Sequence, residues 1–193
     1  QKYGHVTYFW NGNRTGAFDP ARETYVEIPS DVLPFEQRPW MKAAEVTDAL
    51  VTELGRRHYD FVRVNYANGD MVGHTGHLDA TRVAVEAVDL CLARLVLATR
   101  KLEGILVVTA DHGNADQMLE RGSDGRDKVR TSHSLNPVPF AIFDPRAPEQ
   151  APLVRPPDPG SPFGLGHVAS TCLELLGFEA PADYLPSLLA RPA

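Results

Sequence analysis

Short strand-like runs alternate with helical patterns along this chain, and this alternation limits the possible folds more than any other feature. Four runs are rich in Val, Ile, Phe or Tyr, side chains that favour strands. They cover residues 5–10, 61–66, 104–109 and 138–143. Alternating strands and helices usually build a largely parallel sheet with helices on both faces. We therefore expect an α/β fold whose ligands bind beyond the carboxyl ends of the strands.

Three segments have the periodicity of helices. Apolar residues recur at spacings of three and four over residues 43–54. Residues 79–102 are apolar around most of a helical circumference, with one polar strip, which is typical of a core helix with a solvated edge. A third helix is expected over residues 167–176, because Gly177 then provides a stop signal.

Glycine and proline mark the connections between these elements. Nine of the 26 residues from 137 to 162 are proline, and the second half of that segment has no apolar period. We expect an extended surface loop over residues 147–162. A turn is predicted at residues 122–125, where two polar residues lie between glycines.

Length and charge restrict the class of protein further. The 193 residues suffice for one α/β domain or for most of one. Lys and Arg number 19 against 25 Asp and Glu, a net charge of −6, so neither nucleic acid nor an anionic membrane is an expected partner. No apolar run approaches the ~20 residues that cross a bilayer.

The cysteines and the amino terminus bear on the compartment. Cys91 and Cys172 lie inside apolar helical patterns, where a small buried thiol is commoner than a disulfide or a metal ligand. The first residue is Gln1 rather than Met, and no signal peptide pattern follows it. We therefore expect a truncated chain from a cytoplasmic protein.

Three polar segments that follow or flank the predicted strands combine acidic and imidazole side chains with glycine or proline. They are residues 65–76, 109–116 and 131–139. In the first, Asp70 and His74 are four residues apart, so one helical turn would place both on the same face. In the second, Asp111 and His112 are adjacent, and a turn at Gly113 could direct both toward one cavity or two neighbouring ions.

Such side chains are typical of a metal site. Carboxylate and imidazole ligands together suit Mn, Zn, Fe or Co better than Ca. Two divalent ions can hold an attacking oxygen and a transferring phosphoryl group together. A single Asp-x-x-x-His pair is more often a surface pair than a ligand pair, and an isolated His133 would more often be structural. The coincidence of three such segments is what favours a binding site.

The three segments resemble the metal-binding signatures of cofactor-independent phosphoglycerate mutases, a family of the alkaline phosphatase superfamily. Residues 2–12 are similar to that family's lysine-bearing strand, and the resemblance extends to about Phe143, with a weaker match over 167–177. It implies an incomplete alkaline-phosphatase-like fold, with residues 1–193 as the carboxyl-terminal part of the phosphatase-like domain. The parent enzyme would interconvert 3-phosphoglycerate and 2-phosphoglycerate in glycolysis and gluconeogenesis.

The resemblance also implies roles for individual residues. The positions that match ligands of a first divalent ion are Asp70, His74 and His133, and those that match ligands of a second are Asp111 and His112. Both ions would be manganese, with Zn, Co or Mg as alternatives. Lys2 matches a lysine that contacts the phosphate, where a compact cation stabilises developing negative charge.

The chemistry implied by the resemblance is incomplete on this chain. The family's nucleophilic serine, a further aspartate ligand and an inserted substrate-binding domain have no counterpart here. Ser30, Ser132 and Ser134 do not match that serine. We therefore expect catalysis through a phosphoserine that lies outside this chain, with the missing amino-terminal part of the same enzyme as its partner. The chain alone is expected to be inactive.

Two other interpretations stay open. Phosphopentomutases, phosphatases and sulfatases of the same superfamily also place Asp and His around two ions, although residues 70–76 and 131–139 resemble the glycerate mutases more closely. A stand-alone metal-binding or interaction module without catalysis would equally lack the nucleophile. Unpaired sheet edges would also allow the chain to self-associate.

Overall fold

The computed structural model describes residues 1–147 and 163–190, which belong to two compact units. The first unit comprises Gln1–Leu102 and His112–Val138, and the second comprises Glu103–Asp111 and Pro139–Ala193. Helices and strands both occur, so the expected α/β class is confirmed. The surface loop expected at 147–162 lies, beyond Ala147, outside the described residues.

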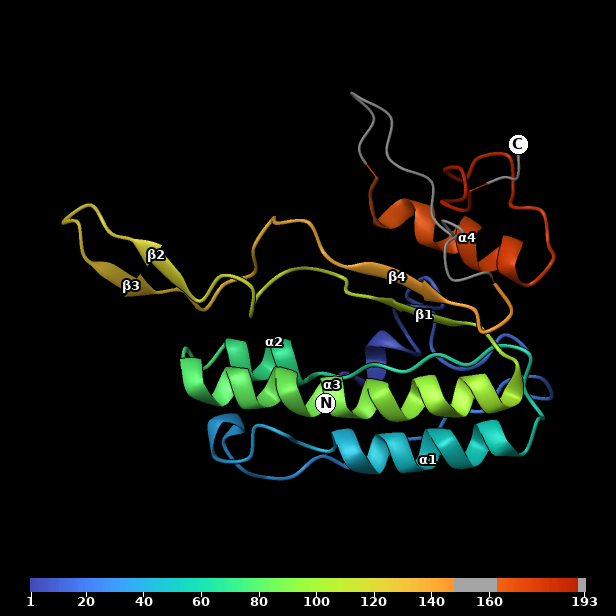
Figure 1. The fold of residues 1–193 in the computed structure, drawn as a ribbon, viewed down its shortest axis with the longest axis horizontal. Coiled ribbons are helices and arrows are strands. Elements are labelled where there is room, and N and C mark those ends of the chain that lie inside the picture. Colours follow the sequence, from blue (N-terminus) through green and yellow to red (C-terminus); the bar gives the residue numbers. More distant parts are fainter. Residues whose placement is uncertain (148–162, 191–193) are drawn as a thin grey trace. The chain divides into compact units, whose positions relative to one another are not determined.

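Three helices form the body of the first unit: α1 (Ala43–Gly55), α2 (Asn68–Gly73) and α3 (Leu78–Leu102). α1 and α3 lie side by side, and the short α2 packs against α3 (Figure 1). A buried cluster of Val72, Ala80 and Ala84 closes the contact between α2 and α3, with Phe35 and Met41 packed against it. Small alanines on α3 let α2 approach closely, so the position of α2 is set by packing.

The helices predicted over 43–54 and 79–102 are confirmed, each with one boundary moved by a single residue. α3 differs from the expected core helix because it buries one face only. Cys91 and Leu95 are buried, whereas Leu90 is 69% exposed. This helix therefore carries more apolar residues than it buries against the rest of the described chain.

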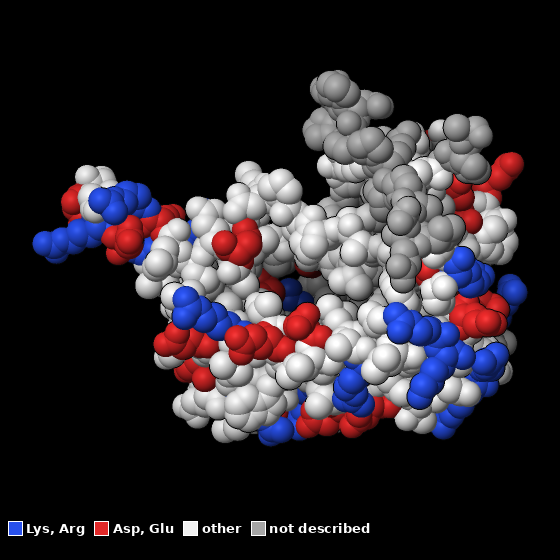
Figure 2. All heavy atoms as spheres, viewed as in Figure 1, with Lys and Arg blue, Asp and Glu red and all other residues white. Residues whose placement is uncertain are grey.

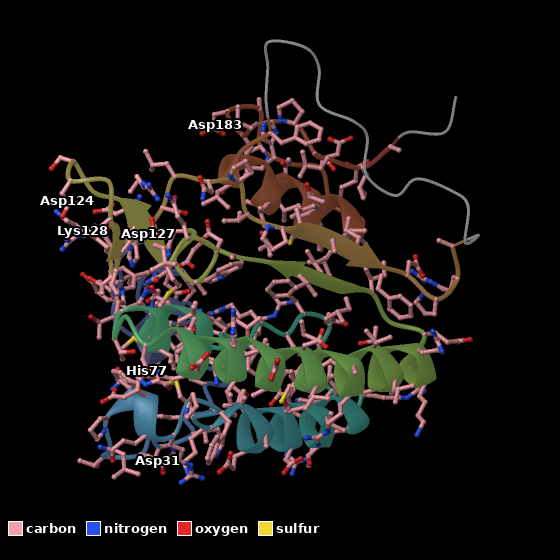
Figure 3. All side chains as sticks on the ribbon, turned by 60° about the vertical axis from the view of Figure 1, so that its left-hand side comes forward. Asp31, His77, Asp124, Asp127, Lys128 and Asp183 are labelled. Atoms are coloured by element: carbon pink, nitrogen blue, oxygen red, sulfur yellow. The ribbon has the colours of Figure 1, made fainter. Side chains whose placement is uncertain are left out.

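A histidine caps the start of α3. The Nδ1 atom of His77 accepts the backbone N–H of Ala80 at 3.3 Å, and its carbonyl accepts the hydroxyl of Thr81 at 3.0 Å. Figure 3 shows His77 at this end of the helix. An N-cap side chain satisfies an amide that the helix itself leaves unpaired. His77 thus has a structural role, although it adjoins one of the candidate ligand segments.

A β-hairpin also belongs to the first unit. β2 (Leu119–Arg121) and β3 (Asp127–Val129) pair antiparallel, with Leu119 opposite Val129. The turn predicted at 122–125 is confirmed, and Gly125 has a φ of 76°, which glycine adopts without steric penalty. Both strands are exposed. Figure 3 labels three charged residues of this hairpin, Asp124, Asp127 and Lys128.

The strands predicted at residues 5–10 and 61–66 are wrong. The 3₁₀ helix η1 (Tyr3–His5) leads into consecutive turns, and residues 61–66 form no strand; a second 3₁₀ helix, η2, covers Phe35–Gln37. Backbone N–H groups of the first segment bond locally, as from Phe9 to the carbonyl of Gly4 at 2.9 Å. Strand-favouring side chains need a neighbouring strand that accepts the backbone bonds. Neither segment has one among the described residues.

The second unit contains an antiparallel pair, β1 (Leu106–Thr109) and β4 (Phe140–Phe143), with Leu106 opposite Phe143. The strands predicted at 104–109 and 138–143 are thereby confirmed. Parallel pairing, however, does not occur between them, and every paired strand within the described residues is antiparallel. A parallel neighbour needs a crossover, usually a helix. The chain between β1 and β4 carries the β2–β3 hairpin and loops instead, so it returns antiparallel.

The carboxyl-terminal helix follows its prediction. η3 (Leu165–His167) and α4 (Val168–Leu175) cover the helix expected over 167–176. Leu176 caps α4, and Gly177 follows it with a φ of 83°, so the predicted stop signal is confirmed. The hydroxyl of Thr171 accepts the backbone N–H of Leu188 at 3.0 Å, which ties α4 to the chain that follows it.

The surface charges and the two cysteine thiols can be compared with what the composition indicates. Acidic and basic side chains are interspersed around α1 and α3 on the face that Figure 2 shows. None of the helices in the described part of the chain has both the length and the apolar character to span a membrane. Cys91 is buried, Cys172 is partly buried, and both are free thiols, as predicted. Burial raises the pKa of the Cys172 thiol, which keeps it protonated and unreactive.

Candidate metal centre

The short helix α2 positions the first two candidate ligands. Val72 is fully buried against α3, so the opposite side of the helix turns away from this core. Asp70 and His74 lie on that other side, four residues apart, and the backbone N–H of His74 donates to the carbonyl of Asp70 at 3.0 Å. Their side chains meet: Oδ1 of Asp70 is 3.1 Å from Nε2 of His74.

The third candidate ligand comes from a distant part of the sequence. His133 follows β3, and its Nε2 lies 3.0 Å from Oδ1 of Asp70 and 3.1 Å from Nε2 of His74. Two ligand atoms bonded to one ion at ~2.1 Å and at right angles to each other are about 3.0 Å apart. The three mutual separations therefore fit three neighbouring ligands of one divalent ion.

A hydrogen bond orients the imidazole of His74. Its Nδ1 lies 2.6 Å from the carbonyl oxygen of Thr131. Because a carbonyl can only accept, Nδ1 carries a proton, and a lone pair for a metal is then available on Nε2, the atom that faces Asp70, when that atom is deprotonated. Metal-binding histidines are commonly fixed in this way by a hydrogen bond from their other nitrogen.

Lys2 lies against the other oxygen of Asp70. Its Nζ is 2.5 Å from Oδ2, and its side chain is 11% exposed, so it is not a solvated lysine. The carboxylate of Asp70 thus has an ammonium on Oδ2 and imidazoles around Oδ1. An anionic ligand approaching the candidate ion would meet this lysine at the same place.

The surroundings keep Asp70 ionised. Burial by itself would raise the pKa of this carboxyl group, but hydrogen bonds from Lys2 and Asn114, together with the charges of Lys2 and His74, outweigh it and lower the pKa to about 2. An ionised carboxylate is the form that binds a metal. Asp70 is therefore ready for ligation at neutral pH without losing a proton.

Asp111 and His112, the two residues expected to bind a second ion, belong to different compact units. His112 belongs to the first unit, where its ring stacks on that of His133 with centroids 3.6 Å apart and its Nδ1 lies 3.9 Å from Oδ1 of Asp70. Asp111 belongs to the second unit, where it is exposed and follows β1. The first unit therefore brings together Asp70, His74, His133 and His112.

The loops that carry His112 and His133 are bound to each other. The backbone N–H of Ser134 donates to the carbonyl of Gly113 at 2.9 Å. The hydroxyl of Ser134, which is buried, donates to Asp116 at 2.9 Å, and the amide of Asn136 donates to the same carboxylate oxygen at 2.6 Å. The hydrogen bond from Asn136 is the main reason why the pKa of Asp116 is lowered. This network fixes the two histidines next to each other.

A glycine makes the approach of these loops possible. A Cβ atom on Gly113 would lie 2.1 Å from Oγ of Ser134 and 2.5 Å from Oδ1 of Asp116. A side chain at position 113 would therefore displace the side chains of Ser134 and Asp116, which hydrogen-bond to each other. The glycine that the sequence suggested as a turn residue is required here for close packing.

Sequence analysis missed several residues of this network. Asn114 and Asp116 lie in a segment that was singled out for its Asp and His, but they have no ligand spacing of their own. The sequence indicates only that Ser134 does not match the family's nucleophile, whereas in the structure it is 3% exposed and donates a hydrogen bond between the loops. The one available signal was their position directly beside the candidate histidines.

A carboxylate and three imidazoles from separate segments define a candidate centre for a divalent metal. The chain belongs to the metalloenzyme superfamily, whose family model matches residues 1–180. Individual relatives confirm the resemblance to cofactor-independent phosphoglycerate mutases.

The chain is 48% identical to the 2,3-bisphosphoglycerate-independent phosphoglycerate mutase of Trypanosoma brucei brucei, over 98% of this chain. It is 50% identical to a probable enzyme of the same name from Leptospira interrogans, again over 98% of this chain. In both cases it spans 35% of the relative's length.

A solved structure is also similar. The phosphoglycerate mutase of Leishmania mexicana, crystallised at low cobalt concentration, matches with a TM-score of 0.90 and 46% identity, over 98% of this chain and 36% of that one. The expected incomplete alkaline-phosphatase-like fold agrees with this match.

Proposed function

We propose that this chain is the metal-binding portion of a phosphoglycerate mutase, an isomerase that interconverts 3-phosphoglycerate and 2-phosphoglycerate through a phosphoserine. The observation that carries the proposal is the convergence of Asp70, His74 and His133, with separations of 3.0–3.1 Å, in a chain about half identical to such mutases. The serine nucleophile lies outside this chain, in the remaining two thirds of the enzyme.

Each candidate ligand has a role in this proposal. Asp70, His74 and His133 hold one divalent ion, and His112 and Asp111 contribute to a second. A bound divalent ion supplies positive charge that stabilises a transferring phosphoryl group. One carboxylate with several imidazoles suits Mn, Co or Zn better than Mg, which prefers oxygen ligands, and the resemblance to the mutase family is our reason for placing manganese first among them.

Lys2 can bind phosphate without leaving Asp70. An ammonium has three N–H donors, and the contact with Oδ2 of Asp70 uses one of them. The other two can donate to phosphate oxygens held beside the ion. Lys2 would thereby position the phosphate and balance part of its charge.

The wider context follows from the same proposal. The two compact units together form the carboxyl-terminal part of one phosphatase-like domain, which is supported by a single family model that runs through both. The missing amino-terminal part of the enzyme is the partner, and phosphoglycerate is the substrate. We place the enzyme in cytoplasmic glycolysis and gluconeogenesis.

A chimaeric enzyme tests the proposal. This chain replaces the matching segment of the Trypanosoma brucei brucei mutase, and conversion of 3-phosphoglycerate and release of free phosphate are both followed with manganese present. We expect conversion, its loss in Asp70→Asn, and no change in His58→Ala, because His58 is exposed and outside the centre.

The other outcomes separate the alternatives. Release of phosphate without conversion by the folded chimaera would favour a phosphatase. Metal binding by the folded chimaera without either reaction would favour a stand-alone metal-binding module. Both results would overturn the proposal.

A further inference from the structure

A buried amide lies beside the candidate ion site and was not among the predicted ligands. Asn114 is 4% exposed, and its Nδ2 is 2.9 Å from Oδ1 and 3.3 Å from the backbone oxygen of Asp70. Both neighbours are acceptors, so this atom must be the NH₂ group. Asn114 therefore donates two hydrogen bonds to a single residue, the candidate ligand Asp70.

The oxygen that Asn114 contacts is the one that faces the imidazoles. Oδ1 of Asp70 lies 3.1 Å from His74 and 3.0 Å from His133, whereas Oδ2 contacts Lys2. A carboxylate oxygen has two lone pairs, so it can accept from Asn114 and still bind an ion. With one donor on each oxygen, the plane of the carboxylate is held in place.

Packing holds the amide itself in one position. Its Oδ1 is buried and has no hydrogen-bond partner among the described residues. A Cβ atom on Gly73 would lie 2.4 Å from this oxygen, so the amide rests directly against the backbone of α2. A buried acceptor without a partner costs stability, and an apolar side chain of the same size would avoid that cost. The amide oxygen thus gains nothing from its burial, and what this side chain contributes is the pair of hydrogen bonds that its NH₂ group donates to Asp70.

We propose that Asn114 is a positioning residue that fixes the carboxylate of Asp70 for metal binding, and that Gly73 is glycine so that this amide can approach α2. The inference rests on the proposed metal site. Hydrogen-bond partners that orient metal ligands commonly change metal affinity by about 10–100-fold when they are removed. We expect an effect of that size from the loss of Asn114.

Cobalt binding tests the inference, with the 193-residue chain as the protein. Asn114→Leu keeps the size of the side chain and removes the donor. It should weaken Co²⁺ binding at least about tenfold in calorimetry and change the visible absorption bands of the bound ion, which report its coordination. A merely structural residue would lower the melting temperature of the metal-free chain and leave the absorption bands of bound cobalt unchanged.

Two further variants complete the design. Gly73→Ala retains every donor and favours a helix, yet it should weaken cobalt binding because the new methyl group displaces the amide. This variant decides the question if Asn114→Leu does not fold. The control is Asn11→Leu, since Asn11 is also buried and donates two hydrogen bonds, to Gly16 and Tyr25, outside the candidate centre; cobalt affinity should stay unchanged.

The outcomes separate this inference from the proposed function. If the unaltered chain binds no cobalt or manganese, the proposed metal site fails. If it binds and both Asn114→Leu and Gly73→Ala bind with the same affinity and the same spectrum, the positioning role fails while the metal site stands. Weaker binding in both, with an unchanged control, supports the positioning role.

Discussion

The ammonium of Lys2 lies 2.5 Å from Oδ2 of Asp70, although the two residues are 68 positions apart in the sequence. This ion pair joins the amino-terminal segment to α2 at the candidate metal centre. It also places a fixed positive charge beside a group that is proposed to bind a divalent cation. The effect of this charge on metal affinity and its effect on the pKa of Asp70 can be measured separately.

Removing the charge of Lys2 should tighten metal binding. In Lys2→Met the repulsion between an ammonium and a divalent ion disappears, which we put at about 1 kcal/mol after screening, or about fivefold in affinity. Manganese titration of the chain at low and high salt measures this, and the gain should shrink at high salt. Weaker binding in Lys2→Met would mean that the lysine acts mainly by orienting Asp70.

The same substitution should change the acid stability of the chain. The pKa of Asp70 is about 2 in the fold, below its ordinary value of 3.8, so its contribution to stability is present above pH 3.8 and is lost as the pH falls toward 2. Without Lys2 this pKa rises, and the free energy of unfolding should fall less steeply between those pH values. Urea unfolding of both proteins across this range tests the sign.

Replacing His133 by Ala should remove the stronger metal site. We expect one stronger manganese site per chain, because Asp70, His74 and His133 meet in one unit, whereas Asp111 and His112 are part of a larger ligand set. His58→Ala should bind manganese like the unaltered chain. Two equally tight sites in the unaltered chain would contradict this assignment.

Separating the two histidine loops should lower both stability and metal affinity. Ser134→Ala removes a partly buried hydrogen bond to the carboxylate of Asp116, which should cost about 0.5–1.5 kcal/mol in unfolding free energy. Because the same bond holds the loop of His133, manganese affinity should also fall. Ser123→Ala, in the exposed hairpin turn, is the matched control and should change stability by less than about 0.5 kcal/mol. Equal behaviour of the two variants would show that this network does not organise the centre.

The chain alone should not convert 3-phosphoglycerate, even with manganese in excess. Phosphoryl transfer through a covalent intermediate needs an activated nucleophile in line with the phosphate, and no serine here matches the family's nucleophile. Conversion of 3-phosphoglycerate by the purified chain, free of any full-length enzyme, would contradict the proposed division of the active site. Mixing with a separately expressed amino-terminal part of a relative should restore conversion.

The sequence alone was sufficient for the features that depend on near neighbours. The periodic apolar residues of α1 and α3 predict helices because each turn repeats the same local pattern. The spacing of Asp70 and His74 predicts a shared face for the same reason. Gly125 and Gly177 mark a turn and a helix end, because a positive φ is a property of the residue itself.

Tertiary structure decided everything that depends on which segments meet. Residues 5–10 and 61–66 have strand composition but no partner among the described residues, and a strand exists only when another segment completes its hydrogen bonds. The approach of His133 to Asp70 was expected from family resemblance, not from spacing. The contacts of Lys2 and Asn114 with that carboxylate had no local signal, because they arise from distant segments packed around α2.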